Sequence, residues 1–195
     1  MTHGISNGIS PITEGLFTYD SRMMQGQKLA VDGYGDSTIW TGTYLGSQAF
    51  RYDVTADPQA KANVLRIVKP LSGHLRVTGA TGYISRYWAP KDSLGYYGDE
   101  WCSQSDRCHK VDTGPFARDF WWGQTSRDQY TGWFFGMALA YDLLDDEDMR
   151  SIIREDVGTV VKTLMKNGWV IIAEDGKPSP VAPVILPSIA LSGII

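Results

Sequence analysis

The sequence contains few of the features that mark several common classes of protein. Its 195 residues include only two cysteines and three histidines, and no cluster of these residues has metal-ligand spacing. No nucleophile elbow or phosphate-binding loop occurs in it. No apolar run is long enough to span a membrane. The first residues, Met1–Ile5, show no basic region followed by an apolar core, so no signal peptide is visible. We therefore expect no metal, no cofactor and no membrane span.

The charge balance is mildly acidic. The formal net charge is −4, which argues against nucleic acid or an anionic membrane as the main partner. Hydrophobic residues make up 43% and charged residues 21%, as in a soluble globular chain. Aromatic residues reach 12%, with seven Trp and ten Tyr. Such rings suit stacking on sugar faces, and they equally suit packing in a core or an interface.

One stretch, residues 130–144, organises the chain. Only Thr131 and Asp142 are strongly polar in it, so a helix here has no solvent face and is expected to be buried nearly all round. Gly132 and Gly136 lie one turn apart and remove side-chain bulk from one stripe. The stretch therefore predicts a buried helix that another helix approaches closely.

The same construction occurs 90 residues earlier, in residues 36–53. Gly42 and Gly46 stand where the later stretch has Gly132 and Gly136. Similarity at a fixed offset indicates a repeated supersecondary unit.

An amphipathic segment follows each of these stretches, and we predict four principal helices. Asp57 supplies an N-cap before Pro58, and Pro70 is expected to kink the second helix or to end its regular part early. Because the first and third helices lack a polar face, we expect them to be more buried than the other two. The predicted helices cover residues 37–54, 58–75, 127–144 and 147–167.

The remaining segments show no helical period. Residues 1–35 are predicted to be an irregular N-terminal segment with a short helix near residues 21–29. Residues 36–176 form the predicted two-hairpin domain, which includes a long irregular aromatic-rich loop at 79–124. A short strand is expected near 169–173. Residues 177–195 are a Pro-rich apolar tail.

Two cysteines lie in the long loop. Cys102 and Cys108 are separated by five polar residues and are expected either to form a local disulfide or to remain free thiols. A disulfide implies an exported protein, secreted or periplasmic. Near the first helix, the acidic turn at 32–36 is better explained as a turn with an N-cap than as a calcium loop.

The alternation of buried and amphipathic helices, the glycines at the inner contacts and the aromatic-rich loop resemble the (α/α) toroids of the six-hairpin glycosidase-like superfamily. The acid in Ser-Arg-Asp128-Gln-Tyr-Thr-Gly-Trp looks like the placement in its unsaturated glucuronyl and rhamnogalacturonyl hydrolases. The resemblance covers roughly residues 36–176 and is architectural. It implies a mainly α, toroid-like fold, here with two hairpins of six. From this resemblance we expect an incomplete ring, so that the chain would be a fragment, a truncated product or a subunit of a ring completed by other chains, such as a homo-oligomer.

Glycoside cleavage commonly uses two carboxyl groups, and we predict that Asp36 and Asp128 supply them. They occupy equivalent positions at the starts of the two buried helices. The alternative is that each only caps its own helix. The predicted substrate-binding residues are Arg86, Trp101, Arg118, Trp121, Trp122, Arg127, Gln129 and Tyr130.

Three functional hypotheses follow from this pattern. The first is a carbohydrate-active enzyme, most simply a glycoside hydrolase or a polysaccharide lyase. The second is a carbohydrate-binding protein without catalysis. The third is a self-assembling structural protein whose aromatic surface is an oligomer contact.

Overall fold

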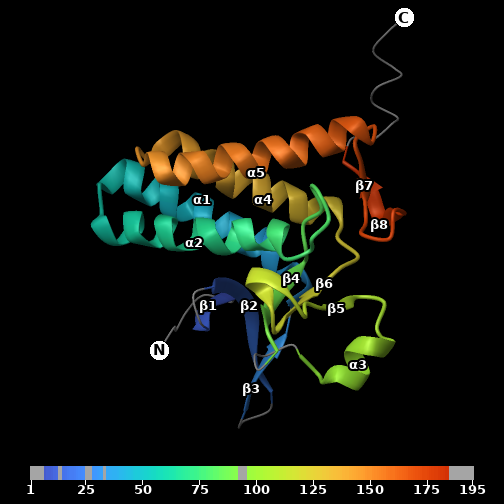
Figure 1. Cartoon of the computed structure of the whole chain (residues 1–195). Helices are drawn as coiled ribbons and strands as arrows, with labels where there is room; N and C mark the ends of the chain where they lie inside the picture. Colours follow the sequence, from blue (N-terminus) through green and yellow to red (C-terminus); the bar gives the residue numbers. More distant parts are fainter. Residues whose placement is uncertain (1–6, 13–14, 25–27, 33, 92–95, 185–195) are drawn as a thin grey trace, which may run out of the picture.

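The fold of this protein is mainly helical (Figure 1). A computed structural model describes residues 7–12, 15–24, 28–32, 34–91 and 96–184. Four long helices lie close to the predicted positions. They are α1 (Ser37–Thr55), α2 (Pro58–Arg76), α4 (Arg127–Leu143) and α5 (Glu147–Lys166). Each end agrees with the prediction within about one residue, because local capping signals set these boundaries. The side chains of Asp57 and Asp146 accept hydrogen bonds from the first turns of α2 and α5.

The helices α1 and α4 lie side by side in the same direction and in close contact. A Cβ atom built on Gly132 would lie 2.5 Å from the Cα atom of Ile39, and one on Gly136 would lie 2.9 Å from the Cα atom of Gly42. Farther along, a Cβ atom on Gly46 would lie 2.9 Å from a methyl group of Leu139. The close approach predicted from the glycine stripes is therefore confirmed, since any side chain at these positions would collide with the facing helix.

The amphipathic helices α2 and α5 cover one side of the α1–α4 pair and pack against each other. The prediction that α1 and α4 are more buried than α2 and α5 is confirmed against α5 and wrong for α2. Eleven of the 19 residues of α2 are buried, against eight of 19 in α1. The helix α2 packs on α1, α5 and β4, whereas no other described element covers one side of α1 and α4. Large apolar side chains lie there, with Phe50 48% and Phe135 44% exposed.

Pro70 does not end α2, contrary to one of the two predicted outcomes. The helix continues to Arg76, and neighbouring side chains bind the carbonyl groups around the proline. Trp88 Nε1 donates to the Pro70 carbonyl at 3.1 Å, and Trp133 Nε1 donates to the Leu71 carbonyl at 2.9 Å. These bonds hold the two indole rings against α2. The carbonyl that the proline leaves without a helical donor is that of Arg66, four residues earlier.

The prediction of an irregular N-terminal segment with a short helix is wrong for the described residues. The segment forms an antiparallel sheet of β1 (Asn7–Ile12), β2 (Gly15–Met24) and β3 (Lys28–Asp32), in that order. A short 3-10 helix, η1 (Tyr34–Asp36), leads from the sheet into α1. Strand β2 runs beside α1 and α2. Strand pairing depends on partners elsewhere in the chain, so a Gly- and Ser-rich sequence conceals it.

The 79–124 segment is more regular than the predicted loop. It contains a second sheet in the order β4-β6-β5, a short helix and a 3-10 turn. The disulfide between Cys102 and Cys108 is present and closes the chain from α3 to β5. Behind it, the buried side chains of Tyr87, Ala89 and Phe120 form a small core with the two cysteines. The elements are β4 (Tyr87–Pro90), α3 (Asp99–Gln104), β5 (Cys108–Lys110), η2 (Gly114–Phe116) and β6 (Asp119–Trp122).

The C-terminal part forms a two-stranded sheet of β7 (Val170–Ile172) and β8 (Pro178–Pro183). The strand predicted near 169–173 is confirmed. The start of the predicted aperiodic tail is instead a strand, and residues 185–195 of that tail lie outside the described residues.

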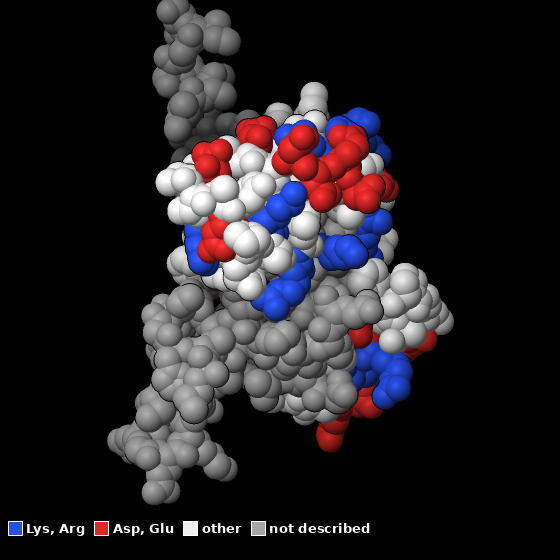
Figure 2. All heavy atoms as spheres, turned by 90° about the vertical axis from the view of Figure 1, so that its left-hand side faces the viewer, with Lys and Arg blue, Asp and Glu red and all other residues white. Residues whose placement is uncertain are grey.

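Acidic side chains gather at the end of the helical layers, over the α4–α5 connection (Figure 2). Asp146 caps α5, and Glu147 and Asp148 lie in its first turn. Carboxylates there stabilise the helix through its unpaired N–H groups. This acidic end lies at the opposite end of α4 from Asp128.

Candidate functional site

The starts of α1 and α4 meet, and a buried amide joins them. The side chain of Gln129 is 0% exposed. Its Oε1 accepts from the backbone N–H of Ile39 at 3.0 Å, and its Nε2 donates to Asp36 Oδ1 at 2.9 Å. Asp36 is the N-cap residue of α1 but makes no capping bond with its side chain. Gln129 thus takes over the capping of α1 and leaves the Asp36 carboxylate available for other contacts.

Arg86 ties this junction to the loop before α4. Its Nη2 lies 2.9 Å from Asp36 Oδ1, and its Nε donates to the Gly35 carbonyl at 2.6 Å. Its Nη1 donates to the Gln124 carbonyl at 3.1 Å and to Ser126 Oγ at 2.9 Å. The arginine side chain is 20% exposed and that of Asp36 is 47% exposed. An arginine with four acceptors is a fixed group, so it holds the Asp36 carboxylate in place.

The backbone around Arg86 explains why the arginine lies there. Its N–H donates to the Trp122 carbonyl at 2.8 Å, and its carbonyl accepts from the Thr38 N–H at 3.2 Å. Beneath it, the buried ring of His74 has Nδ1 2.8 Å from Thr38 Oγ1 and 3.1 Å from the Ser85 carbonyl. Burial lowers the pKa of His74 to about 3, so the ring is neutral and serves as packing and hydrogen-bonding material.

Asp128 lies in the first turn of α4, exposed, on the same side of the junction. Its Oδ2 lies 3.4 Å from the Nε2 atom of Gln129, a longer contact than the 2.9 Å bond to Asp36. Because both carboxylates approach the Nε2 atom of Gln129, the distance between their nearest oxygens cannot exceed the sum of these two contact distances. The structure therefore brings together the two predicted acids, and neither merely caps its own helix.

Three predicted sugar-binding residues, Trp121, Tyr130 and Gln129, are buried, and these assignments need correction. Trp121 is 4% exposed, and its ring stacks on His109 at a centroid distance of 4.0 Å. Tyr130 is 1% exposed, and its hydroxyl donates to the Gly82 carbonyl. Burial raises the pKa of this hydroxyl. Trp122 is partly buried, as Trp101 is, and the two rings pack on each other beside the second core. Gln129, fully buried, positions Asp36 instead of contacting a substrate.

Trp101 and the two remaining predicted arginines are more accessible. Trp101 is partly buried between Tyr97 and Trp122. Arg127 precedes Asp128 and is exposed, with no ion pair to a described residue. Arg118 lies in the turn before β6, with a positive φ of 77°. Of the two, Arg127 is the one that the chain places beside the paired acids.

Two features of the structure were not predicted from the sequence. Trp40 lies in the first turn of α1, four residues after Asp36, and it is 42% exposed. The i, i+4 spacing was the available signal. The second feature is the partner of His109, whose Nε2 lies 3.1 Å from Oε1 of Glu174. Burial lowers the pKa of His109, and the charges of Glu174 and Asp106 oppose that shift. No local spacing connects residues 65 positions apart.

Within the described residues, no group of three or more His, Cys, Asp or Glu side chains is arranged to hold a metal ion. None of the helices found there has the length and apolar character needed to cross a membrane. Comparison of the chain with protein-family models, with curated proteins and with solved structures gives no match. The functional argument consequently depends on the geometry of the site alone.

Proposed function

We propose that this protein is a carbohydrate-active enzyme of glycoside-hydrolase type that uses Asp36 and Asp128 as its paired carboxylates. One observation carries the proposal. Two parallel helices start side by side, and each contributes an acid that reaches the same buried amide, Gln129. Glycosidases need two carboxyl groups held at a fixed separation across the bond that breaks. The hairpins α1–α2 and α4–α5 are also compatible with two neighbouring hairpins of an (α/α) toroid.

The two acids have different surroundings, which suits a division of roles. Asp36 is paired with Arg86, and we assign it the role of nucleophile or base. Asp128 makes no ion pair with a described residue, and we assign it the role of general acid. The two contacts to Gln129 limit how far apart the nearest oxygens of the acids can lie, and this limit is compatible with both the retaining and the inverting spacing. Trp40 and Arg127 would bind the sugar, the first through its ring and the second through a carboxylate or sulfate.

Substitution of the two acids tests this assignment. The assay measures release of reducing ends from a panel of neutral and acidic polysaccharides, together with hydrolysis of chromogenic aryl glycosides. On any substrate that is turned over, Asp36→Asn and Asp128→Asn should each lower kcat by about 10²–10⁴, the usual contribution of acid–base groups. Asp142→Asn is the matched control, because this exposed acid lies on α4 at its other end. Unchanged turnover in Asp128→Asn would exclude the pair.

A second candidate function is supported by the uncovered side of α1 and α4. Phe50, Phe135 and Val54 are 48%, 44% and 79% exposed, which is unusual for helices without a polar face. A non-catalytic carbohydrate-binding or self-assembling protein would use this side as a contact surface. Light scattering together with the turnover assay separates the two: a stable oligomer that hydrolyses none of the panel supports assembly. The disulfide supports an exported, secreted or periplasmic protein for either function.

A further inference from the structure

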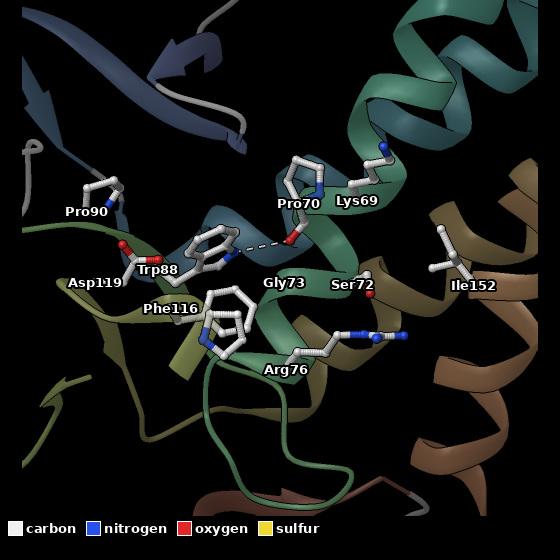
Figure 3. A pocket seen from close by; sticks show the side chains of 11 residues that line it. Lys69, Pro70, Ser72, Gly73, Arg76, Trp88, Pro90, Phe116, Asp119 and Ile152 are labelled. Carbon is white, nitrogen blue, oxygen red and sulfur yellow. Dashed lines mark hydrogen bonds between the residues drawn. The ribbon is translucent and has the colours of Figure 1, made fainter. Parts of the chain in front are cut away.

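A pocket of about 570 Å³ lies away from the paired acids, between α2, α5 and the β4–η2 region (Figure 3). Its volume is in the range of small-molecule sites. One side of α2 forms the floor, from Lys69 through Gly73 to Arg76, and Ile152 of α5 forms one wall. Neither Asp36 nor Asp128 lines it, so the pocket is separate from the proposed catalytic site.

The opposite wall is apolar and rigid. The rings of Trp88 and Phe116 meet edge to face at a centroid distance of 5.4 Å. Trp88 is anchored by its bond to the Pro70 carbonyl and packs tightly on Gly73, where a Cβ atom would lie 2.8 Å from the Cε2 atom of the indole. Two prolines, Pro90 and Pro115, extend this wall. Such a wall is already formed without a ligand and offers an apolar ring a surface to pack on.

The charges around the pocket are uneven. Arg76 Nη2 lies 2.9 Å from Asp156 Oδ1 and 3.4 Å from Glu155 Oε2, so two acids already compensate this arginine. Lys69 is exposed and makes no ion pair with a described residue. Arg66, one turn earlier on α2, binds only the Asn63 amide among the described side chains, so it adds positive charge near Lys69. The Lys69 end of the floor is thus the one with uncompensated positive charge.

The acidic residue of the lining does not cancel that charge. Asp119 lies beside Pro90 and Trp88, toward the other wall from Lys69 (Figure 3). Among the described lining residues, a ligand carboxylate at the Lys69 end would therefore meet the Lys69 ammonium group and no acid.

We propose that this pocket binds a small carboxylate with an apolar ring. The ring packs against Trp88 and Phe116, and the carboxylate binds the Lys69 ammonium group. The predominance of apolar wall disfavours a polyhydroxylated ring, which would leave hydroxyl groups without partners. The ligand class is thus different from the sugar proposed for the paired acids, and the inference does not depend on that proposal.

The test measures binding of benzoate to the full chain by titration calorimetry and by ligand-observed NMR, with benzamide and D-glucuronate as comparison probes. We expect saturable benzoate binding that weakens with added salt, and weaker binding of benzamide and glucuronate. Lys69→Gln should raise the Kd for benzoate about three- to tenfold and leave benzamide unchanged, because only benzoate carries the charge. Phe116→Ala should weaken both probes. Lys162→Gln, which removes an exposed charge from α5 away from the pocket, is the matched control.

Several results would overturn the proposal. If benzoate binding does not saturate, or if benzoate binds no more tightly than benzamide, the ligand is not recognised through a carboxylate. If glucuronate binds more tightly than benzoate, the pocket does not select an apolar ring. If Lys69→Gln leaves the Kd for benzoate unchanged, Lys69 is not the cation that binds the carboxylate. Circular dichroism of each variant ensures that loss of binding is compared only among folded proteins.

Discussion

Substitution of Gly132 by alanine tests the close packing that positions the paired acids. An added methyl group would lie 2.5 Å from the Cα atom and 2.6 Å from the carbonyl oxygen of Ile39, where carbon atoms normally stay about 3.5–4.0 Å apart. Both facing atoms belong to the backbone of α1, so no side-chain rotation relieves the collision. The two helices must separate by roughly 1 Å, within the contact that brings Asp36 and Asp128 together.

The magnitude follows from two opposing terms. Overpacking typically costs about 1–3 kcal/mol and more where backbone must move, whereas Ala is favoured over Gly in a helix by about 1 kcal/mol. We expect Gly132→Ala to lower the free energy of unfolding by about 2 kcal/mol. For a chain of this length the corresponding fall in Tm is about 4–8 °C. Urea and thermal unfolding followed by circular dichroism measure both quantities.

Gly158 supplies the matched control, because it lies inside α5 and a Cβ atom there would meet nothing within 4 Å. Gly158→Ala should leave stability unchanged or raise it by up to about 1 kcal/mol. If Gly132→Ala is as stable as the wild type while Gly158→Ala behaves as stated, α1 and α4 do not pack backbone to backbone, and the argument for the site loses its basis.

The remaining predictions concern pH and the disulfide. Burial holds the folded-state pKa of His74 near 3, below its unfolded value of about 6.5, so the unfolded chain binds the extra proton between these values. The contribution of the neutral His74 ring to stability should be fully present above pH 6.5 and should fall by up to about 1.4 kcal/mol per pH unit on acidification toward pH 3. In urea unfolding, His74→Gln should therefore show a midpoint that depends less steeply on acid pH than that of the wild type. An identical slope in the two proteins would contradict this account. Replacing Cys102 and Cys108 together by serine should lower stability by ~2 kcal/mol, the loop-closure contribution for so short a loop, with no effect of reductant on the variant. Equal stability of the variant and the oxidised wild type would show that the disulfide does not hold the second core.

The helices were well predicted because their signals are local. Asp57 and Pro58 mark the start of α2 in two adjacent residues, and the structure begins the helix there. The glycine stripe at Gly132 and Gly136 likewise predicted a close contact from spacing alone. The N-terminal sheet was missed because a strand such as β2 acquires its hydrogen bonds from β1 and β3, and the composition of the segment resembles that of a loop.

The candidate site shows the same limit at the level of single residues. Asp36 and Asp128 were predicted from equivalent positions in a repeat, and the structure brings both within reach of Gln129. Tyr130 was predicted to face a sugar, yet its ring fills the core, because the side of α4 that meets α5 and the loop was not identifiable from a helix apolar all round.

The sequence by itself determined where the long helices start and stop, which residues allow two of them to touch, and which two cysteines can pair. These properties depend on capping, side-chain size and short chain separation. Only the tertiary structure decided which side of each helix is covered, that Arg86 lies against an acid 50 residues before it, and that His109 meets Glu174. Such contacts join segments far apart in the chain, and the packing of the whole core fixes them, so no local pattern of residues encodes them.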